Sequence, residues 1–340
     1  MGTNTGKKII LLTRELSSNS QDKLSSSVEG KCEIKSPATL KDEDFPRVEV
    51  LLLDTILQGD MEWLSAESLK RFPNLKLIQS TRAGVDAINF EEIPSGILVC
   101  GNVGAYGEQI AEHVFGMILY FARNIGLSNQ LLAKGIWEIP ESIFLKGKTI
   151  LVLGAGGIGE PVAKLATSFG MKTLGVNTSG KSVPDFDQVV SLDKFEELSR
   201  EADVVVIALP LTVKTFHLID DRALSKMKPK CILVNIARGY IIDEASIYKH
   251  LRENPAFKCA LDVWWHYPKK GEKFAQEFPF FDLPNFLGTP HDSGIVPETQ
   301  EIALLSSFEN IARFAKDEPL RGLMVGRDYQ GLKELIARAN

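Results

Sequence analysis

The chain has 340 residues, which is long enough for two ordinary domains with separate cores. Its 44% apolar and 24% charged residues are typical of a soluble globular protein. The 39 basic and 44 acidic residues give a net charge of −5 and include no long basic block, which argues against nucleic acid or an anionic membrane as a partner.

Cysteine spacing and the N-terminal segment indicate the compartment. The chain has four widely spaced cysteines with no CxxC pair: Cys32, Cys100, Cys231 and Cys259. We expect buried, reduced thiols and no metal site. The segment 1–8 lacks the apolar core of a signal peptide, and the apolar run 114–122 is too short to span a bilayer. These features predict a cytoplasmic protein.

The first third of the chain reads as a small parallel α/β domain. Its strand candidates are Lys8–Thr13, Cys32–Lys35, Val48–Asp54, Leu75–Ser80 and Ile97–Asn102. Met61–Phe72 has a helical pattern between two of them. The loop Thr81–Asp86 follows a strand, and its Gly84 could expose backbone N–H groups to a carboxylate or simply form a turn.

A long amphipathic helix is predicted after Gly101–Gly107, with Ile110, Val114 and Phe121 on its apolar stripe. His113, one turn into this helix, is interpreted as a hydrogen-bonded structural residue. Arg123–Leu145 reads as a polar connection to the next domain.

The central feature is the stretch Gly147–Asn177. Thr149–Leu153 predicts a buried strand, a GxGxxG turn follows at 154–159, and a helix and the strand Lys172–Val176 come after it. In such a βαβ unit the glycines let the backbone approach a pyrophosphate at the helix N-terminus. The context favours a dinucleotide site over a tight turn that binds nothing.

Five further strands complete a doubly wound sheet whose following loops gather around one crevice. They are Gln188–Leu192, Asp203–Leu209, Cys231–Ile236, Cys259–Trp264 and Phe286–His291. A helix is expected at Asp193–Ser199. A second long helix, Glu298–Ala315, is expected to return the chain to the first domain, where Leu320–Asn340 packs as a tail.

Two side chains at these strand ends suggest hydride-transfer chemistry. Arg238 offers a rigid fork of N–H donors that suits the carbonyl and carboxylate of an α-keto acid. His291 can protonate the oxygen that becomes negative as a hydride arrives, and can take the proton back in the reverse reaction. Taken singly, Arg238 could instead form a salt bridge and His291 could be an ordinary loop residue after Pro290.

Nearly the whole chain resembles the D-isomer-specific 2-hydroxyacid dehydrogenase family, which includes glyoxylate/hydroxypyruvate reductases, phosphoglycerate dehydrogenases and, more distantly, formate dehydrogenases. Seven motifs carry the resemblance, in the family's order: Ala83–Asp86, Ala111–His113, Leu153–Gly159, Leu209–Thr212, Asn235–Gly239, Ala260–Val263 and Thr289–His291.

The resemblance implies an α/β fold with two Rossmann-like domains. A doubly wound parallel-sheet NAD(P)-binding domain, residues 106–294, would be inserted into a smaller flavodoxin-like substrate domain made of residues 1–105 and 295–340. The active site would lie between them, and the protein would be a homodimer.

It also implies the roles of individual residues. Arg238 and the backbone of Ala83 and Gly84 would bind the substrate, His291 would be the acid/base, and Asp262 would contact the nicotinamide carboxamide region. The expected cofactor-binding residues are Gly154, Gly156, Gly157, Ile158, Gly159, Asn177, Thr178, Ser179, Lys181, Leu209, Pro210, Ile236, Ala237, Arg238, Asp262 and His291.

One departure from the family concerns the partner of the histidine. The family places a glutamate five residues after the aspartate of its DV motif, and this chain has Tyr267 there. A phenol can orient the imidazole of His291 but brings no charge at neutral pH. We therefore expect His291 to lose its proton at lower pH than in relatives, and we include Tyr267 among the catalytic residues. The same substitution raises the alternative of a catalytically impaired sensor or corepressor.

The second departure concerns the cofactor. NAD enzymes carry an acidic residue at the end of the second strand to bind the ribose hydroxyls. The segment 177–182 has no carboxylate there to repel a 2′-phosphate, and it offers hydroxyls and Lys181. We predict NADP(H), with NAD as the alternative and Lys181 as an ordinary solvated lysine in that case.

The sequence thus predicts a 2-keto acid reductase or D-2-hydroxyacid dehydrogenase. Glyoxylate, hydroxypyruvate and bulkier keto acids all remain open as substrates. Trp264, Trp265 and Tyr106 could line the pocket, or lie in the core or a dimer interface.

Overall fold

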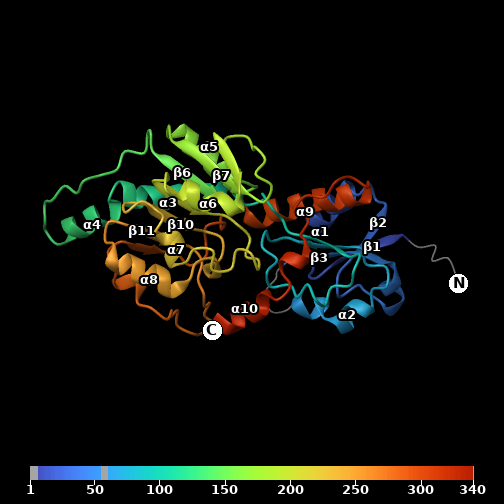
Figure 1. Ribbon diagram of the computed structural model, residues 1–340. Coiled ribbons are helices and arrows are strands. Elements are labelled where there is room, and N and C mark those ends of the chain that lie inside the picture. Colours follow the sequence, from blue (N-terminus) through green and yellow to red (C-terminus); the bar gives the residue numbers. More distant parts are fainter. Residues whose placement is uncertain (1–6, 55–59, 340) are drawn as a thin grey trace. The chain divides into compact units, whose positions relative to one another are not determined.

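The computed structural model describes residues 7–54 and 60–339 and divides the chain into two compact units (Figure 1). The first unit runs to Tyr106 and resumes over Pro297–Lys333. The second is Gly107–Val296 together with the residues from Glu334 onward.

The first unit is built on a five-stranded parallel sheet. Its strands are β1 (Lys8–Leu12), β2 (Cys32–Lys35), β3 (Val48–Leu53), β4 (Leu77–Ser80) and β5 (Leu98–Cys100). Their order is β2-β1-β3-β4-β5, which is the flavodoxin-like order. The predicted strands are therefore all present, and the expected fold class is confirmed for this unit.

Helices cover both faces of this sheet. Its elements are α1 (Ser18–Ser27), η1 (Asp42–Arg47), η2 (Asp60–Leu64), α2 (Ala66–Lys70), α9 (Thr299–Ala315) and η6 (Gly326–Asp328). Figure 1 shows α1 and α9 on one face and α2 on the other. Leu24 of α1 and Phe308 of α9 are buried with Ile10, Val50 and Leu52 of the strands, so segments from both ends of the chain share one core.

Met61–Phe72 was predicted as one helix, and this is wrong. The 3₁₀ helix η2 ends at Leu64, and α2 begins after Ser65. The Ser65 hydroxyl accepts a hydrogen bond from the Ser68 N–H at 3.2 Å, which caps α2. Because the cap fixes Ser65 in an extended conformation, the helical pattern is interrupted there.

The second unit contains a seven-stranded parallel sheet. Its strands are β6 (Thr149–Leu153), β7 (Lys172–Asn177), β8 (Gln188–Ser191), β9 (Val204–Ile207), β10 (Ile232–Asn235), β11 (Lys258–Leu261) and β12 (Phe286–Gly288). The order is β12-β11-β10-β9-β6-β7-β8. This is the 3-2-1-4-5-6 arrangement of a dinucleotide-binding fold with a seventh strand added at one edge. All seven predicted strands are present.

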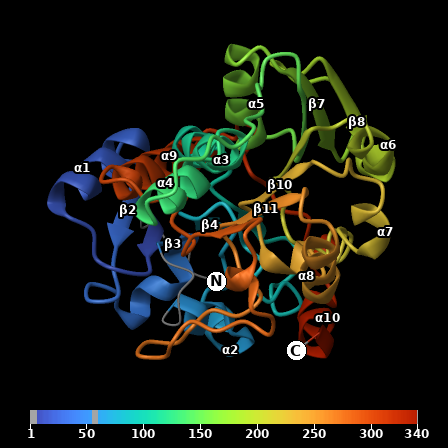
Figure 2. The same ribbon diagram turned by 90° about the vertical axis from the view of Figure 1, so that its left-hand side faces the viewer.

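Helices also cover both faces of the second sheet, as expected for a doubly wound fold. They are α3 (Gly107–Ala122), α4 (Ile125–Ala133), α5 (Gly159–Ser168), η3 (Leu192–Lys194), α6 (Phe195–Ser199), α7 (Asp221–Leu224), η4 (Gly239–Ile241), α8 (Glu244–Glu253) and η5 (Phe280–Asp282). Figures 1 and 2 show α3 and α5 on one side of the sheet and α7 and α8 on the other. The expected single helix at Asp193–Ser199 is a 3₁₀ turn followed by α6.

The connection Arg123–Leu145 also differs from expectation. It contains α4, none of whose residues is buried, and a following stretch that exposes large apolar side chains. Trp137 and Ile139 are each 86% exposed, and Phe144 is 73% exposed. The segment therefore exposes large apolar side chains among its polar ones.

The chain end was expected to pack on the first domain. Residues to Lys333 group with the first unit, whereas those from Glu334 group with the second. Helix α10 (Leu332–Ala339) starts at a buried leucine and spans the boundary between these two groups of residues.

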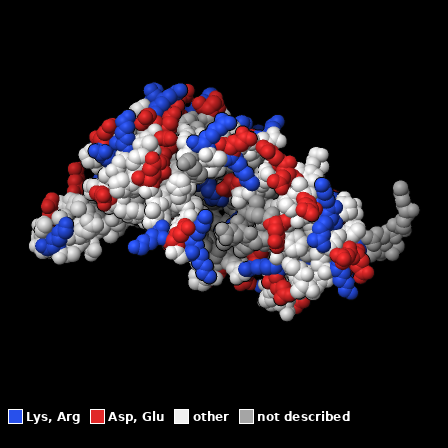
Figure 3. Space-filling view, turned by 90° about the horizontal axis from the view of Figure 1, so that it is seen from below, with Lys and Arg blue, Asp and Glu red and all other residues white. Residues whose placement is uncertain are grey.

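The cysteines are free thiols, three of them buried as expected and Cys32 half-buried. Burial raises the pKa of the Cys100 thiol to about 11 and that of Cys231 to about 12. Within the described residues, no helix is both long and apolar enough to cross a membrane. On the face drawn in Figure 3, side chains of both charges are interspersed.

Candidate functional site

Two glycines of the turn between β6 and α5 occupy positions where a side chain does not fit. Gly154 has a φ of +114°, and a Cβ there would lie 2.5 Å from the carbonyl oxygen of Ala208. A Cβ at Gly159 would overlap the carbonyl oxygen of Gly154. Only glycine therefore allows the tight turn at Gly154 and the close packing of α5 onto the turn.

The middle of the turn is open. A Cβ at Gly156 would meet no atom within 4 Å, so the absence of a side chain serves no packing purpose inside the protein. The N-cap of α5, Ile158, provides no side-chain hydrogen bond to the first turn of the helix. Open space beside an uncapped helix N-terminus fits the pyrophosphate of a dinucleotide.

The loop after β7 is organised by Asn177. Its Oδ1 accepts hydrogen bonds from the N–H groups of Ser179 at 3.0 Å and Gly180 at 2.6 Å, and its Nδ2 donates to the Lys181 carbonyl at 2.9 Å. Thr178, Ser179 and Lys181 are exposed. Asn177 thus shapes the loop, and the exposed side chains beside it are those available to a ligand.

The loop after β9 carries Leu209 and Pro210, of which Leu209 is buried and Pro210 exposed. The Thr215 hydroxyl donates to the Pro210 carbonyl at 2.6 Å and accepts from the Thr212 N–H at 2.8 Å. Sequence reasoning missed Thr215, although two threonines three residues apart after a Leu-Pro pair are a recognisable turn signal.

Arg238 lies just after β10, in extended backbone with φ −148° and ψ 144°. The buried Asn235 side chain fixes this segment, because its Nδ2 donates to the Arg238 carbonyl at 2.9 Å and its Oδ1 accepts from the Ala237 N–H at 3.0 Å. Ile236 and Ala237 are buried and Arg238 is half-buried. Sequence analysis did not predict that the Asn235 side chain holds the segment that carries Arg238.

Asp262 follows β11 and is fully buried. Its Oδ1 accepts from the Thr289 hydroxyl at 2.6 Å and the Asp292 N–H at 3.0 Å, and its Oδ2 accepts from the Ser293 N–H at 3.1 Å. In the described contacts the carboxylate therefore holds the loop that carries His291. Nitrogen and oxygen atoms of His113, Asp262 and Asp292 lie within 4.8 Å of one another. Three protein donors bind Asp262, so the described contacts of this group are those of a hydrogen-bonded cluster.

His291 and Tyr267 lie side by side in the second unit, with ring centroids 5.5 Å apart and planes at 42°. Both are exposed. The Tyr267 hydroxyl accepts a hydrogen bond from the Trp264 N–H at 3.2 Å, which fixes the ring next to the imidazole. His291 has a φ of +61°, an uncommon conformation for a side chain of this size.

The two tryptophans belong to the core. Trp264 is 3% and Trp265 5% exposed, and their indole N–H groups donate to the carbonyls of Thr289 at 2.9 Å and Ile242 at 2.8 Å. Trp265 stacks on Phe280 with centroids 5.6 Å apart. Neither is available to line a pocket.

Ala83 and Gly84 belong to the first unit, where they follow β4 and are half-buried. The Asn102 Nδ2 donates to the Thr81 carbonyl at 3.0 Å, and the Tyr106 hydroxyl donates to the same carbonyl at 2.5 Å. These bonds hold the loop at the end of β4. Burial raises the pKa of Tyr106.

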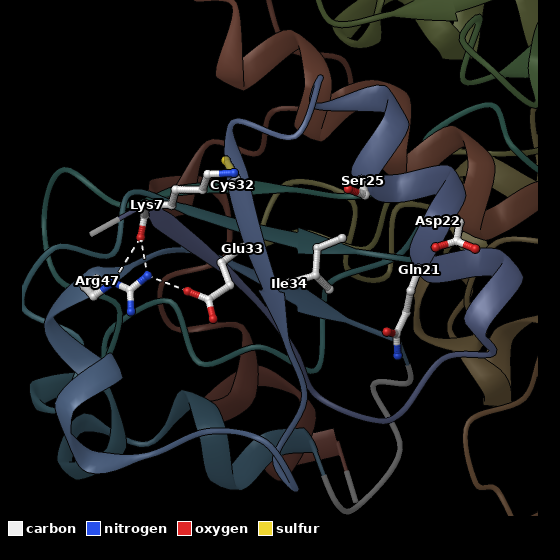
Figure 4. A pocket seen from close by; sticks show the side chains of 8 residues that line it. All are labelled: Lys7, Gln21, Asp22, Ser25, Cys32, Glu33, Ile34 and Arg47. Carbon is white, nitrogen blue, oxygen red and sulfur yellow. Dashed lines mark hydrogen bonds and ion pairs between the residues drawn. The ribbon is translucent and has the colours of Figure 1, made fainter. Parts of the chain in front are cut away.

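A separate pocket of about 530 Å³ lies entirely in the first unit, beside β2 (Figure 4). Arg47 lines this pocket, and its guanidinium is already bound: it donates to the Lys7 carbonyl at 2.8 Å and pairs with Glu33. The pocket contains none of the predicted site residues. We therefore place the candidate site at the carboxyl ends of the second sheet.

Comparisons with known proteins identify the family of the second unit. Residues 115–293, which lie within the second unit, match the family model described as D-isomer specific 2-hydroxyacid dehydrogenase, NAD binding domain. A D-3-phosphoglycerate dehydrogenase of Methanocaldococcus jannaschii is 34% identical over 259 residues, which cover 75% of this chain but only 48% of that protein, so the match spans about half of its length.

Two further similarities extend over both units. A glyoxylate reductase of Thermococcus litoralis is 30% identical over 295 residues, which cover 82% of this chain and 87% of that protein. The crystal structure of a putative formate dehydrogenase from Pyrobaculum aerophilum superposes with a TM-score of 0.79 at 27% identity, covering 94% of this chain and 99% of that one.

Proposed function

The chain belongs to the D-isomer specific 2-hydroxyacid dehydrogenase family, and from this premise we propose how its own residues perform the reaction. It is an NAD(P)-dependent oxidoreductase that transfers a hydride between a nicotinamide and C2 of a 2-keto or 2-hydroxy acid. When bound, the reduced nicotinamide supplies the hydride. The observation that carries the assignment is the open glycine turn in the same unit as the Tyr267–His291 pair.

The second unit holds the cofactor in this proposal. Gly154, Gly156, Gly157, Ile158 and Gly159 leave room and backbone N–H groups for the pyrophosphate. Further contacts would come from the loops after β9, β10, β11 and β12, through Leu209, Pro210, Ile236, Ala237, Asp262 and His291. The first unit is then the substrate domain, with Ala83 and Gly84 as the carboxylate site.

Arg238 and His291 have different roles in this proposal: Arg238 binds the substrate and His291 transfers the proton. The Arg238 guanidinium binds the carboxylate and the carbonyl oxygen of the keto acid through its fork of donors. As C2 accepts the hydride, the imidazolium of His291 gives its proton to the carbonyl oxygen, which becomes the hydroxyl of the product. Neutral His291 regains a proton from water before the next reduction.

NADP(H) is the proposed cofactor. In the loop after β7, Asn177 Oδ1 is occupied by two backbone N–H groups, and the exposed groups are the hydroxyls of Thr178 and Ser179 and the ammonium of Lys181. A 2′-phosphate would accept hydrogen bonds from these donors without a carboxylate to repel it. Comparing KM for NADPH and NADH tests this, and a clear preference for NADH would overturn it.

We also propose a homodimer and a cytoplasmic location. The apolar surface of the 125–144 segment supports self-association, since Trp137 and Ile139 are almost fully exposed in the isolated chain. The free thiols support a reducing compartment.

The test of the function is NADPH oxidation measured against a panel of 2-keto acids that includes glyoxylate and hydroxypyruvate. We expect turnover with at least one. His291→Gln should lower kcat by about 10²- to 10⁴-fold, whereas Arg238→Gln should chiefly raise KM for the keto acid. No turnover with any acid, together with tight NADPH binding, would instead favour a dinucleotide-binding sensor, the function that Tyr267 in place of a glutamate also suggests.

A further inference from the structure

The turn that presents His291 needs support from outside itself. A histidine at φ +61° is in the left-handed region, where a residue with a Cβ stays only if its surroundings hold it. The two residues after it, Asp292 and Ser293, donate their backbone N–H groups to the carboxylate of Asp262 at 3.0 and 3.1 Å. The buried carboxylate therefore clamps the turn directly after His291.

The clamp depends on Thr289 as well. The Thr289 hydroxyl lies 2.6 Å from Oδ1 of Asp262 and is the third protein donor to this carboxylate. The backbone of Thr289 is fixed too, because its carbonyl accepts the indole N–H of Trp264 at 2.9 Å. Thr289 thus holds the turn from the side that precedes His291.

The number of protons on the Thr289 hydroxyl determines which group donates in its contact with His113. A hydroxyl has one proton, and that of Thr289 is used on a carboxylate that can only accept. The contact of 3.2 Å between Thr289 Oγ1 and His113 Nε2 must therefore be a donation by the imidazole Nε2–H. His113 Nε2 also lies 4.0 Å from Oδ1 of Asp262, so its donor side faces the buried carboxylate.

We propose that His113 and Thr289 are positioning residues for His291: a hydrogen-bond chain from His113 through Thr289 to Asp262 anchors the left-handed turn to α3. The inference rests on the proposed role of His291 as the acid/base. Helix α3 is a rigid support, and His113 projects from its first two turns. General acid catalysis needs hydrogen-bond distance to the substrate oxygen, and a displacement of about 1 Å costs on the order of a hundredfold in rate.

Thr289→Val tests the chain, because it removes the hydroxyl and keeps the shape of the side chain. We expect kcat to fall about ten- to a hundredfold, with little change in KM for the keto acid, which Arg238 binds. Thr289→Ser restores the hydroxyl and should recover most of kcat. His113→Leu, at the other end of the chain, should lower kcat in the same way, and His113→Gln should retain part of it because an amide can donate to Thr289.

Thr173→Val is the matched control. Thr173 is also buried, in the same unit, and its hydroxyl donates to the Asp185 carbonyl at 3.0 Å and accepts from the Asp187 N–H at 3.1 Å. Losing these bonds should lower the melting temperature and leave kcat within about twofold of wild type. A fall in kcat for Thr289→Val alone then reports position rather than general loosening of the fold.

The outcomes separate this inference from the proposed function. If His291→Gln keeps the wild-type kcat, the proposed acid/base role fails and the inference with it. If His291→Gln is inactive but Thr289→Val and His113→Leu keep the wild-type kcat, only the positioning inference is wrong. Should Thr289→Val not fold, His113→Leu and the Thr289→Ser comparison decide the question.

Discussion

Glu244 is the first residue of α8, and its carboxyl group is buried. Among the described residues its Oε1 has no hydrogen-bond partner. Burial, assisted by the negative charge of Glu277, raises the pKa of this carboxyl from 4.5 to about 7. Folding therefore favours the protonated form of Glu244 across the mildly acidic range.

The sign of the resulting pH dependence follows from proton linkage. Between its ordinary pKa of 4.5 and about 7, Glu244 binds more protons in the folded than in the unfolded chain, so this contribution to stability declines as the pH rises through that window. Glu244→Gln removes the dependence. At about pH 8 we expect the variant to be more stable than wild type, by about 3 kcal/mol at most.

Urea unfolding between about pH 5 and pH 8 measures this difference. Glu253→Gln, at the exposed end of the same helix, is the control and should follow the wild-type curve. Parallel curves for wild type and Glu244→Gln would contradict the prediction.

A second prediction at the scale of residues concerns Tyr267, the neighbour of His291. Tyr267 places an uncharged ring 5.5 Å from the imidazole, whereas a glutamate there would favour the imidazolium. In Tyr267→Glu the alkaline limb of keto-acid reduction should move up by about one pH unit. Tyr267→Phe, which keeps the ring, should leave the limb where it is.

The measurement is kcat/KM for the keto acid as a function of pH. A wild-type profile that stays flat through about pH 8, or a Tyr267→Glu profile that coincides with it, would argue against the uncharged ring as the cause.

Sequence motifs predicted the site residues but not all the contacts that hold them in place. The donors to Asp262 lie 27, 30 and 31 positions further along the chain, and no local pattern announces such distant bonds. For Trp264 and Trp265 the aromatic residue type suits a pocket and a core equally well, so burial could be decided only by the packed structure.

At the scale of elements, two glycines of the turn before α5 have different expected roles: Gly156 in cofactor binding and Gly159 in folding. Gly156→Ala places a methyl group where the protein has no atom within 4 Å, so the melting temperature should stay close to that of wild type. The methyl group would occupy the space proposed for the pyrophosphate, and KM for NADPH should rise at least about tenfold. Gly159→Ala is the comparison: its Cβ would overlap the Gly154 carbonyl, and the fold itself should be destabilised by about 1–3 kcal/mol.

Thermal melts and cofactor titrations on the two variants give the result. If Gly156→Ala binds NADPH as tightly as wild type, the pyrophosphate does not lie over the turn.

Element boundaries were predicted less well than elements. Every expected strand is present because the short apolar runs of buried parallel strands are strong signals. The break at Ser65 depends on one side-chain hydrogen bond, which competes with the helical pattern around it. Helix α4 was missed because none of its residues is buried, so the spacing of its apolar residues does not indicate a buried face.

At the scale of the whole molecule, the arrangement of the two sheets was expected from the resemblance to the family. The pattern of residues within one strand does not indicate the strand's place in a sheet. A run such as Val204–Ile207 indicates a buried strand, but its place between β6 and β10 is a long-range property of the fold. A helix between two successive strands allows those strands to pair in parallel. The alternation of strands and helices in the sequence therefore predicted the α/β class.

The exposed apolar segment after α4 predicts the assembly state. Burying Trp137 and Ile139 against a second copy would remove two large apolar side chains from water, worth about 1.5–3 kcal/mol for each side chain fully buried. The double variant Trp137→Glu, Ile139→Glu should therefore shift a dimer toward monomer. Light scattering coupled to size-exclusion chromatography measures this.

Leu323→Glu is the control, since Leu323 is 51% exposed in the first unit and lies outside the proposed interface. A wild-type protein that is monomeric at high concentration would contradict the proposal, as would a double variant that stays dimeric.

The distribution of thiols also has a practical consequence. Cys100, Cys231 and Cys259 are buried, whereas Cys32 is half-buried, so Cys32 is the thiol most accessible to a maleimide dye. One fluorophore can be placed on the first unit without engineering the chain. Energy transfer from bound NADPH to that fluorophore would report whether the two units approach each other during turnover.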